Sequence, residues 1–118
     1  MRAVVAATAG ALALSACGPA NALTGTELYR NCTEGKQSIG SAMCLAYVRG
    51  FAEGIVFGNE LGKLPRAFCP PTAGLHVDQA RLIIEKFLRD NPDKLHNEAV
   101  FLAGQALMEA FGCIGKSN

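Results

Sequence analysis

The sequence predicts an all-α protein, a small bundle of about four helices cross-linked by two disulfides. Apolar residues recur at helical spacing along most of the chain, and no run of alternating polar and apolar residues indicates a strand. Four cysteines lie in the part that would form the folded domain. The 118 residues are enough for one domain, and a hydrophobic content of 50% argues against disorder.

The N-terminus has the composition of an export signal. Arg2 is followed by a stretch rich in Ala, Val and Leu that continues to Leu14. About a dozen apolar residues suit a signal peptide and fall short of the roughly 20 that a membrane-spanning helix needs. We therefore expect residues 1–22 to be a signal segment and residues 23–118 to form one domain that is exported from the cytoplasm.

Two processing routes remain open. Cleavage after Ala20-Asn21-Ala22, a small-x-small site, would release a protein that begins at Leu23. Leu14-Ser15-Ala16-Cys17 resembles a bacterial lipobox, in which Cys17 would carry the lipid. On this second route the protein would be anchored to the membrane and face the periplasm.

The cysteine count predicts structural disulfides. Either processing route removes Cys17 from the redox count, which leaves an even number: Cys32, Cys44, Cys69 and Cys113. In an oxidising compartment this number predicts two disulfides, for which three connectivities are possible. No Cys-x-x-Cys pair suggests a zinc ribbon or a redox site.

The first two helices have clear boundaries. Thr24-Gly25-Thr26-Glu27 matches a capping box, which predicts a helix that continues to Cys32 or Thr33. A second helix should begin near Ser38 to Ala42 and end at about Leu61, with Gly62 in the left-handed conformation. Its expected buried stripe is Met43, Val48, Phe51, Ile55 and Phe57. The Gly-x-x-x-Gly pair within it, Gly50 and Gly54, predicts close packing against another helix.

Two more helices follow a proline-rich loop. The third should run from about Val77 to Asp90, with an apolar side made of Leu82, Ile83, Phe87 and Leu88. Asn91-Pro92 reads as a cap followed by a first-turn proline, so a fourth helix is expected from there to about Phe111. This layout favours disulfides Cys32–Cys44 and Cys69–Cys113, worth about 3 and about 4 kcal/mol in the chain-entropy model.

The charges and side chains give no catalytic or cofactor site. Arg2 accounts for one of the 11 Lys and Arg residues, so the remainder balances the 10 Asp and Glu residues and suggests no nucleic-acid surface. His76 and His96 share no metal-ligand spacing. Glu53 and Glu60, seven residues apart, are expected to form an exposed charged face. We therefore do not expect an enzyme.

The predicted domain resembles the immunity proteins that protect bacteria from type VI secretion amidase toxins, the Rap/Tai family. The resemblance runs from about Leu23 to Cys113. It depends on these segments in order: Thr24-Gly25-Thr26-Glu27-Leu28, Cys32, Cys44-Leu45-Ala46-Tyr47-Val48-Arg49-Gly50, Phe68-Cys69-Pro70-Pro71, Gln79, Asn91-Pro92-Asp93-Lys94-Leu95-His96 and Ala106-Leu107-Met108-Glu109-Ala110-Phe111-Gly112-Cys113. His76 and Gly112 depart from the family's usual Thr and Pro.

The resemblance implies a periplasmic protein that binds a peptidoglycan amidase effector and covers its active-site cleft with a rigid loop. Two segments are candidates for this contact, the loop from Lys63 to Val77 and the turn from Asp90 to His96. Their charged candidate residues are Lys63, Arg66, His76, Asp93, Lys94 and His96. A homodimer is compatible with this interpretation.

Two alternatives have different partners. A small disulfide-bonded periplasmic chaperone would expose apolar surface when its carboxylates and histidines become protonated. An envelope protein of the same fold would bind an unrelated partner.

Overall fold

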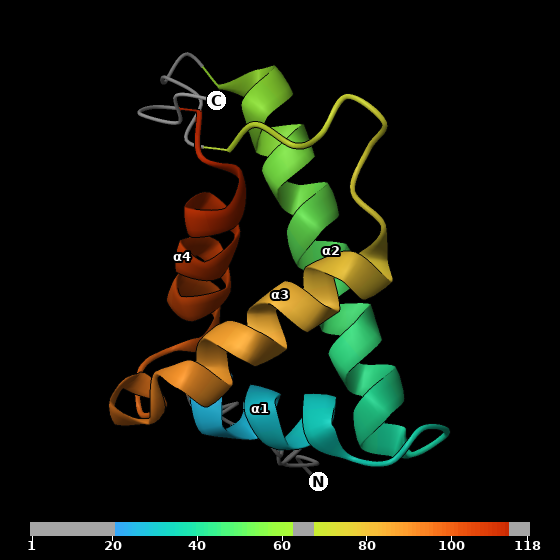
Figure 1. The fold of residues 1–118 in the computed structure, drawn as a ribbon, viewed down its shortest axis with the longest axis vertical. Coiled ribbons are helices and arrows are strands. Elements are labelled where there is room, and N and C mark those ends of the chain that lie inside the picture. The colour runs from blue at the N-terminus through green and yellow to red at the C-terminus, as the bar shows by residue number, and fades with distance from the viewer. Residues whose placement is uncertain (1–20, 63–67, 114–118) are drawn as a thin grey trace, which may run out of the picture.

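The computed structural model describes residues 21–62 and 68–113, which form four α-helices and one 3-10 turn (Figure 1). The elements are α1 (Gly25–Thr33), α2 (Ile39–Leu61), α3 (Val77–Asp90), η1 (Pro92–Lys94) and α4 (Ala99–Phe111). Within these residues the only extended pairings are two isolated bridges, Thr24 with Glu98 and Phe68 with Gly112. The all-α prediction is confirmed.

A complete capping box begins α1. The Glu27 amide donates to the Thr24 hydroxyl oxygen at 3.3 Å, and the Thr24 amide donates to the Glu27 carboxylate at 2.9 Å. The backbone and side-chain hydrogen bonds from Thr24 hold the pKa of Glu27 below its ordinary value, and the charge of Arg30 acts in the same direction. Two otherwise unpaired donors are satisfied at the first turn, so the predicted start of α1 is confirmed.

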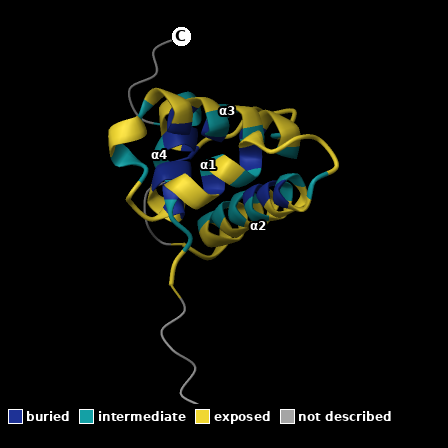
Figure 2. Cartoon of the chain, turned by 90° about the horizontal axis from the view of Figure 1, so that it is seen from below, coloured by how far each residue is buried: buried dark blue, intermediate teal, exposed yellow. Residues whose placement is uncertain are grey.

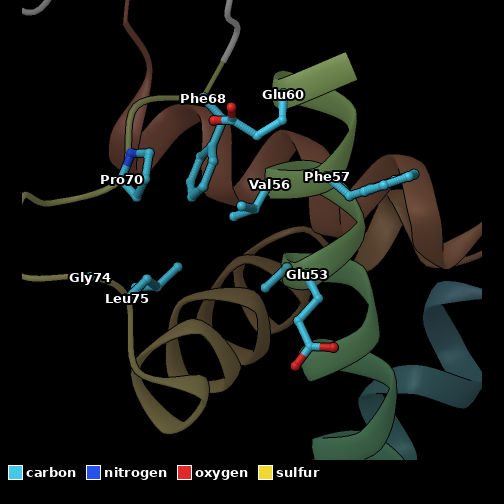
Figure 3. A pocket seen from close by; sticks show the side chains of 9 residues that line it. Glu53, Val56, Phe57, Glu60, Phe68, Pro70, Gly74 and Leu75 are labelled. Carbon is cyan, nitrogen blue, oxygen red and sulfur yellow. The ribbon is translucent and has the colours of Figure 1, made fainter. Parts of the chain in front are cut away.

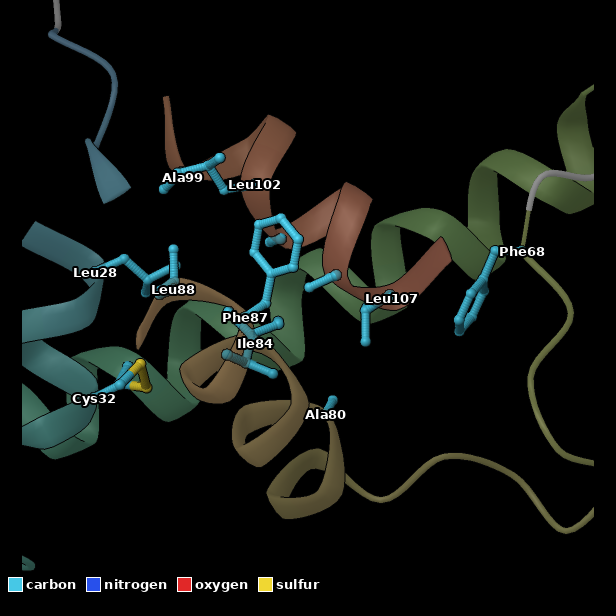
Figure 4. Close-up of a cluster of buried hydrophobic side chains, with 14 residues drawn as sticks. Leu28, Cys32, Phe68, Ala80, Ile84, Phe87, Leu88, Ala99, Leu102 and Leu107 are labelled. Carbon is cyan, nitrogen blue, oxygen red and sulfur yellow. A yellow bond between two sulfur atoms is a disulfide. The ribbon is translucent and has the colours of Figure 1, made fainter. Parts of the chain in front are cut away.

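The core lies where α3 crosses the other helices. The side chains of Leu28, Val48, Ile84, Leu88 and Leu107 are all fully buried, and they come from α1, α2, α3 and α4 (Figure 4). Each contributes on the order of 2 kcal/mol by leaving water. Figure 2 shows the buried positions on the inner sides of the helices and the exposed positions along the outer side of α2.

The two disulfides fix the ends of helices. Cys32–Cys44 connects the end of α1 to the early part of α2, with a Cα–Cα distance of 5.0 Å. Cys69–Cys113 connects the loop before α3 to the residues that follow α4, also at 5.0 Å. The structure therefore has the pairing that the helix layout favours.

Helix α4 begins later than predicted, at Ala99 instead of near Pro92. The carbonyl groups of Leu95 and Asn97 accept hydrogen bonds from the amides of Thr26 and Gly25, at 2.9 and 2.8 Å. A continuous helix would use these carbonyl groups internally. The unpaired amides at the start of α1 therefore compete for them and interrupt the helix.

Several burial predictions for the helices are wrong. Met43 and Phe57 are 55% and 65% exposed, and Leu82 on α3 is 55% exposed. The predicted buried stripe on α2 was too wide. Apart from a glycine, only Cys44 and Val48 of this helix are buried, while Phe51 and Ile55 lie at the edge of the core.

The glycine predictions for α2 are also wrong. A methyl group at Gly50 or Gly54 would meet nothing within 4 Å, so neither glycine supports a helix contact. Gly62 is extended, with φ of −77°, and not left-handed. A close approach between elements occurs instead at Gly25, where a methyl group would collide with Leu102 of α4 and would lie 3.0 Å from the Leu95 carbonyl oxygen.

Helix α2 is long and apolar enough to cross a membrane by length and composition alone. Its Cys44 and Val48 are nevertheless in the protein core, and its first turns are covalently tied to α1. It also carries Arg49, Glu53 and Glu60. These contacts show that α2 is part of the folded bundle, in which it is the longest described helix.

The capping box gives the first prediction. Thr24→Ala should lower the free energy of unfolding by about 1 kcal/mol, because it leaves helix donors unsatisfied. Because the folded pKa of Glu27 is lowered, the carboxylate's contribution is present above pH 4.5 and is lost as pH falls through the lowered value. Denaturant unfolding at pH 7 and pH 3 measures both effects. Thr72→Ala, at an exposed loop position, is the control and should leave the stability unchanged.

The loop lengths give the second prediction. Replacing Cys32 and Cys44 by Ala should cost about 3 kcal/mol, and replacing Cys69 and Cys113 should cost about 4, because the second disulfide closes 44 residues and the first closes 12. Denaturant unfolding of the oxidised variants measures the difference. If removing the Cys32–Cys44 disulfide lowered the free energy of unfolding more than removing Cys69–Cys113, chain entropy would not determine which disulfide stabilises the fold more.

Candidate partner-binding surface

The described residues contain no group of three or more His, Cys, Asp or Glu side chains that could hold a metal ion. Their four cysteines are all in disulfides, so none of the four is a free thiolate nucleophile. The described surface has hollows and exposed apolar side chains that could contact a partner.

The predicted partner-binding residues lie at opposite ends of α3 (Figure 1). His76 immediately precedes this helix, is exposed, and makes no side-chain cap hydrogen bond. Asp93 and His96 are exposed beyond its other end. A helix of 14 residues is about 21 Å long, so the two groups form separate surfaces. Lys63, Arg66 and the possible lipidation site Cys17 lie outside the described residues.

Side-chain contacts hold the turn between α3 and α4 in place. The Asn91 side chain donates to the Phe87 carbonyl oxygen at 2.8 Å, and the Lys94 ammonium lies 5.5 Å from the centre of the Phe87 ring. Lys86 donates to Asp90 at 2.5 Å; with the nearby Arg89, this hydrogen bond holds the pKa of Asp90 below its ordinary value. These contacts fix the backbone of the turn. The Lys94 ammonium lies over the ring of Phe87, which is a core residue.

A groove lies between the C-terminal half of α2 and the loop that leads to α3 (Figure 3). Its volume is about 510 Å³. The described residues that line it are Ala52, Glu53, Val56, Phe57, Glu60, Phe68, Pro70, Gly74 and Leu75. Seven of these nine are apolar residues or glycine. Its lining is more apolar than that of the hollows next to Phe87, Gly35, His76 and Leu45.

The loop wall of this groove is fixed to α4. The Cys69 amide donates to the Phe111 carbonyl oxygen at 2.8 Å, next to the Cys69–Cys113 disulfide. The Phe68 ring packs edge to face on Phe111, with ring centres 6.1 Å apart, and is only 3% exposed. These contacts place Phe68 in the groove, although sequence analysis had identified it only as part of a motif.

Large apolar side chains are exposed on α2 and α4. They are Ile39, Met43, Val56, Phe57 and Leu61 on α2, and Val100, Phe101 and Met108 on α4. A methyl group at Gly104 would lie 3.6 Å from the Phe51 ring, so the two helices approach each other there. The Phe51 ring stacks on Tyr47, whose burial raises the pKa of its hydroxyl. Sequence analysis missed this exposed surface because it assigned Met43 and Phe57 to the core.

Comparison with known families decides the identity of the chain. A model described as Rap1a immunity proteins matches residues 24–113, from the capping residue of α1 to the last cysteine. The chain belongs to the Rap1a immunity protein family. The resemblance inferred from the ordered motifs is therefore confirmed. No curated protein and no solved structure matches the chain.

Membership in this family indicates what the exposed surfaces would contact. The Rap1a family match covers all four helices and both disulfides, so the described fold is the family domain. Membership in this immunity family implies a protein effector of a type VI secretion system as the partner. The groove, the α3–α4 turn and the exposed faces of α2 and α4 are the surfaces available for such contacts.

Proposed function

We propose that this protein neutralises a peptidoglycan amidase effector of a type VI secretion system by covering its active site. The match to the Rap1a immunity proteins over residues 24–113 is the observation that carries this proposal. The protein would act by binding alone and not as an enzyme. Its two disulfides would reduce the entropy lost when the binding surface is ordered in the complex.

The proposed site of action is the periplasm. Residues 1–22 have the pattern of a signal segment, and disulfides persist in oxidising compartments. The target of an amidase, peptidoglycan, lies in the same compartment. Attachment through a lipid on Cys17 would place the domain on the periplasmic side of a membrane, and cleavage after Ala22 would release it.

We also propose that two copies associate through the exposed faces of α2 and α4. Apart from Val56, which faces the groove, seven large apolar side chains on these helices are at least 41% exposed. Each offers on the order of 100 Å², and a stable interface needs roughly 800 Å² from each partner. Met43, Gly50, Gly54, Phe57 and Leu61 follow one stripe of α2, and the two glycines would allow a close approach.

Capture and inhibition test the proposed function. The oxidised domain, residues 23–118, is immobilised and exposed to a periplasmic extract of its own organism, and the retained proteins are identified by mass spectrometry. We expect one cell-wall amidase to be retained, and purified domain to block its hydrolysis of peptidoglycan at near-equal molar amounts. An immobilised domain unfolded by reduction and alkylation is the control for non-specific adsorption.

Two results would contradict this function. Retention of many unfolded proteins would favour a chaperone, especially if retention increased at acidic pH. Retention of envelope components without an amidase would favour a structural role.

Light scattering tests the proposed dimer. The wild-type domain should have twice the monomer mass, and Phe57→Glu should reduce it to the monomer mass, because a carboxylate would be buried in an apolar interface. Leu82→Glu is the control, since Leu82 is also exposed but lies on α3. A monomeric wild-type protein, or a dimeric Phe57→Glu variant, would contradict the proposal.

A further inference from the structure

We propose that the groove between α2 and the loop before α3 receives a segment of the effector in which a large apolar side chain stands next to Lys or Arg. The apolar side chain would enter the groove, and the cation would pair with Glu53. This inference rests on the proposed function and adds the chemistry of the contact.

The groove has space and apolar walls for one large side chain. Val56 forms the α2 wall and is 50% exposed, while Phe68 and Leu75 face it from the loop (Figure 3). A volume of about 510 Å³ is within the range of about 300–1,000 Å³ that ligand sites occupy. Filling the groove with an aliphatic or aromatic side chain would remove this apolar surface from water, which is favourable.

The polar groups of the groove suit a peptide segment better than a small metabolite. Small-molecule sites place several polar groups around the ligand to fix its orientation. Among the described residues that line the groove, the charged or polar side chains are two carboxylates, Glu53 and Glu60, both on α2 (Figure 3). A peptide segment that places one large apolar side chain, the anchor, in the groove beside one charged residue needs no more polar groups than these two carboxylates.

The negative charge of Glu53 favours a Lys or Arg in the effector, next to the apolar side chain that enters the groove. No Lys, Arg or His is among the described residues that line the groove. Glu53 is exposed and makes no hydrogen bond or ion pair with any described residue. Arg49 and His76 line the neighbouring hollow, which also contains Glu53. A cation that arrives with the anchor can therefore pair with Glu53 from the side of the groove.

The walls are in place before binding. Cys69–Cys113, the Cys69–Phe111 hydrogen bond and the contact between Phe68 and Phe111 hold the loop to α4. The Asn59 side chain, from α2, also donates to the Phe68 carbonyl oxygen at 3.5 Å. Because both walls are linked to the bundle, little ordering entropy is lost when a side chain enters.

The test measures the affinity of groove variants for the amidase retained by the wild-type domain, by calorimetry at low and at high salt. Glu53→Lys and Val56→Asp should each weaken binding by about tenfold or more, because one repels the cation and the other puts a charge against the apolar anchor. Glu53→Gln should weaken binding less and should reduce its salt dependence, an effect that a purely structural role would not produce.

Matched controls lie on other helices. Glu109→Lys repeats the charge reversal on α4, in a hollow that Lys86 and Asp90 of α3 also line and that is separate from the groove. Leu82→Asp repeats the apolar-to-acid change on α3. Both should bind within about twofold of wild type. Circular dichroism and light scattering identify any variant that has lost its fold or changed its oligomeric state, and the exposed Glu53→Gln change provides a second variant if Val56→Asp fails to fold.

The outcomes separate the two proposals. If the wild-type domain binds the amidase and all groove variants bind equally well, the groove inference is overturned while the proposed function stands. If the wild-type domain retains no amidase, the proposed function is overturned and the inference with it. Weaker binding by the groove variants alone, with less salt dependence for Glu53→Gln, supports the inference.

Discussion

The bundle depends on the burial of Ile84 and Leu88, because the helix that carries them, α3, is packed against all three others. Both side chains are fully buried. Contacts from α3 reach α1, α2 and α4, whereas α2 and α4 have few contacts with each other. Helix α3 contributes Ala80, Ile84, Phe87 and Leu88 to the common core. The apolar surface buried in that core is the main favourable term for this fold.

The exposed surfaces follow from this arrangement. Because α2 and α4 each turn one side toward α3, their outer sides have no helix to cover them. Phe57 and Phe101 are 65% and 69% exposed for this reason. Exposed apolar side chains in such number commonly mark contact sites in soluble domains, and the immunity family of this chain supplies a reason for contacts.

The groove arises where the covalent and packing constraints meet. Cys69–Cys113 holds the loop near the end of α4, while α2 extends past the core toward the same end of the molecule (Figure 1). The loop therefore lies opposite Val56 and Glu53 without collapsing onto them. The result is a rigid, partly apolar recess lined by two carboxylates, Glu53 and Glu60. Its shape is set by elements far apart in the sequence.

The sequence by itself determined the helical class, the start of α1 at a capping box and the span of α3, since these depend on local hydrogen bonds and periodicity. It allowed three cysteine connectivities, and the predicted helix layout favoured the one that the structure has. Tertiary structure decided where α4 begins, because the amides of Gly25 and Thr26 take the carbonyl groups of Asn97 and Leu95. It also decided which apolar side chains stay exposed. Periodicity identifies the apolar side of a helix, but only the packing of other helices decides how much of that side is covered.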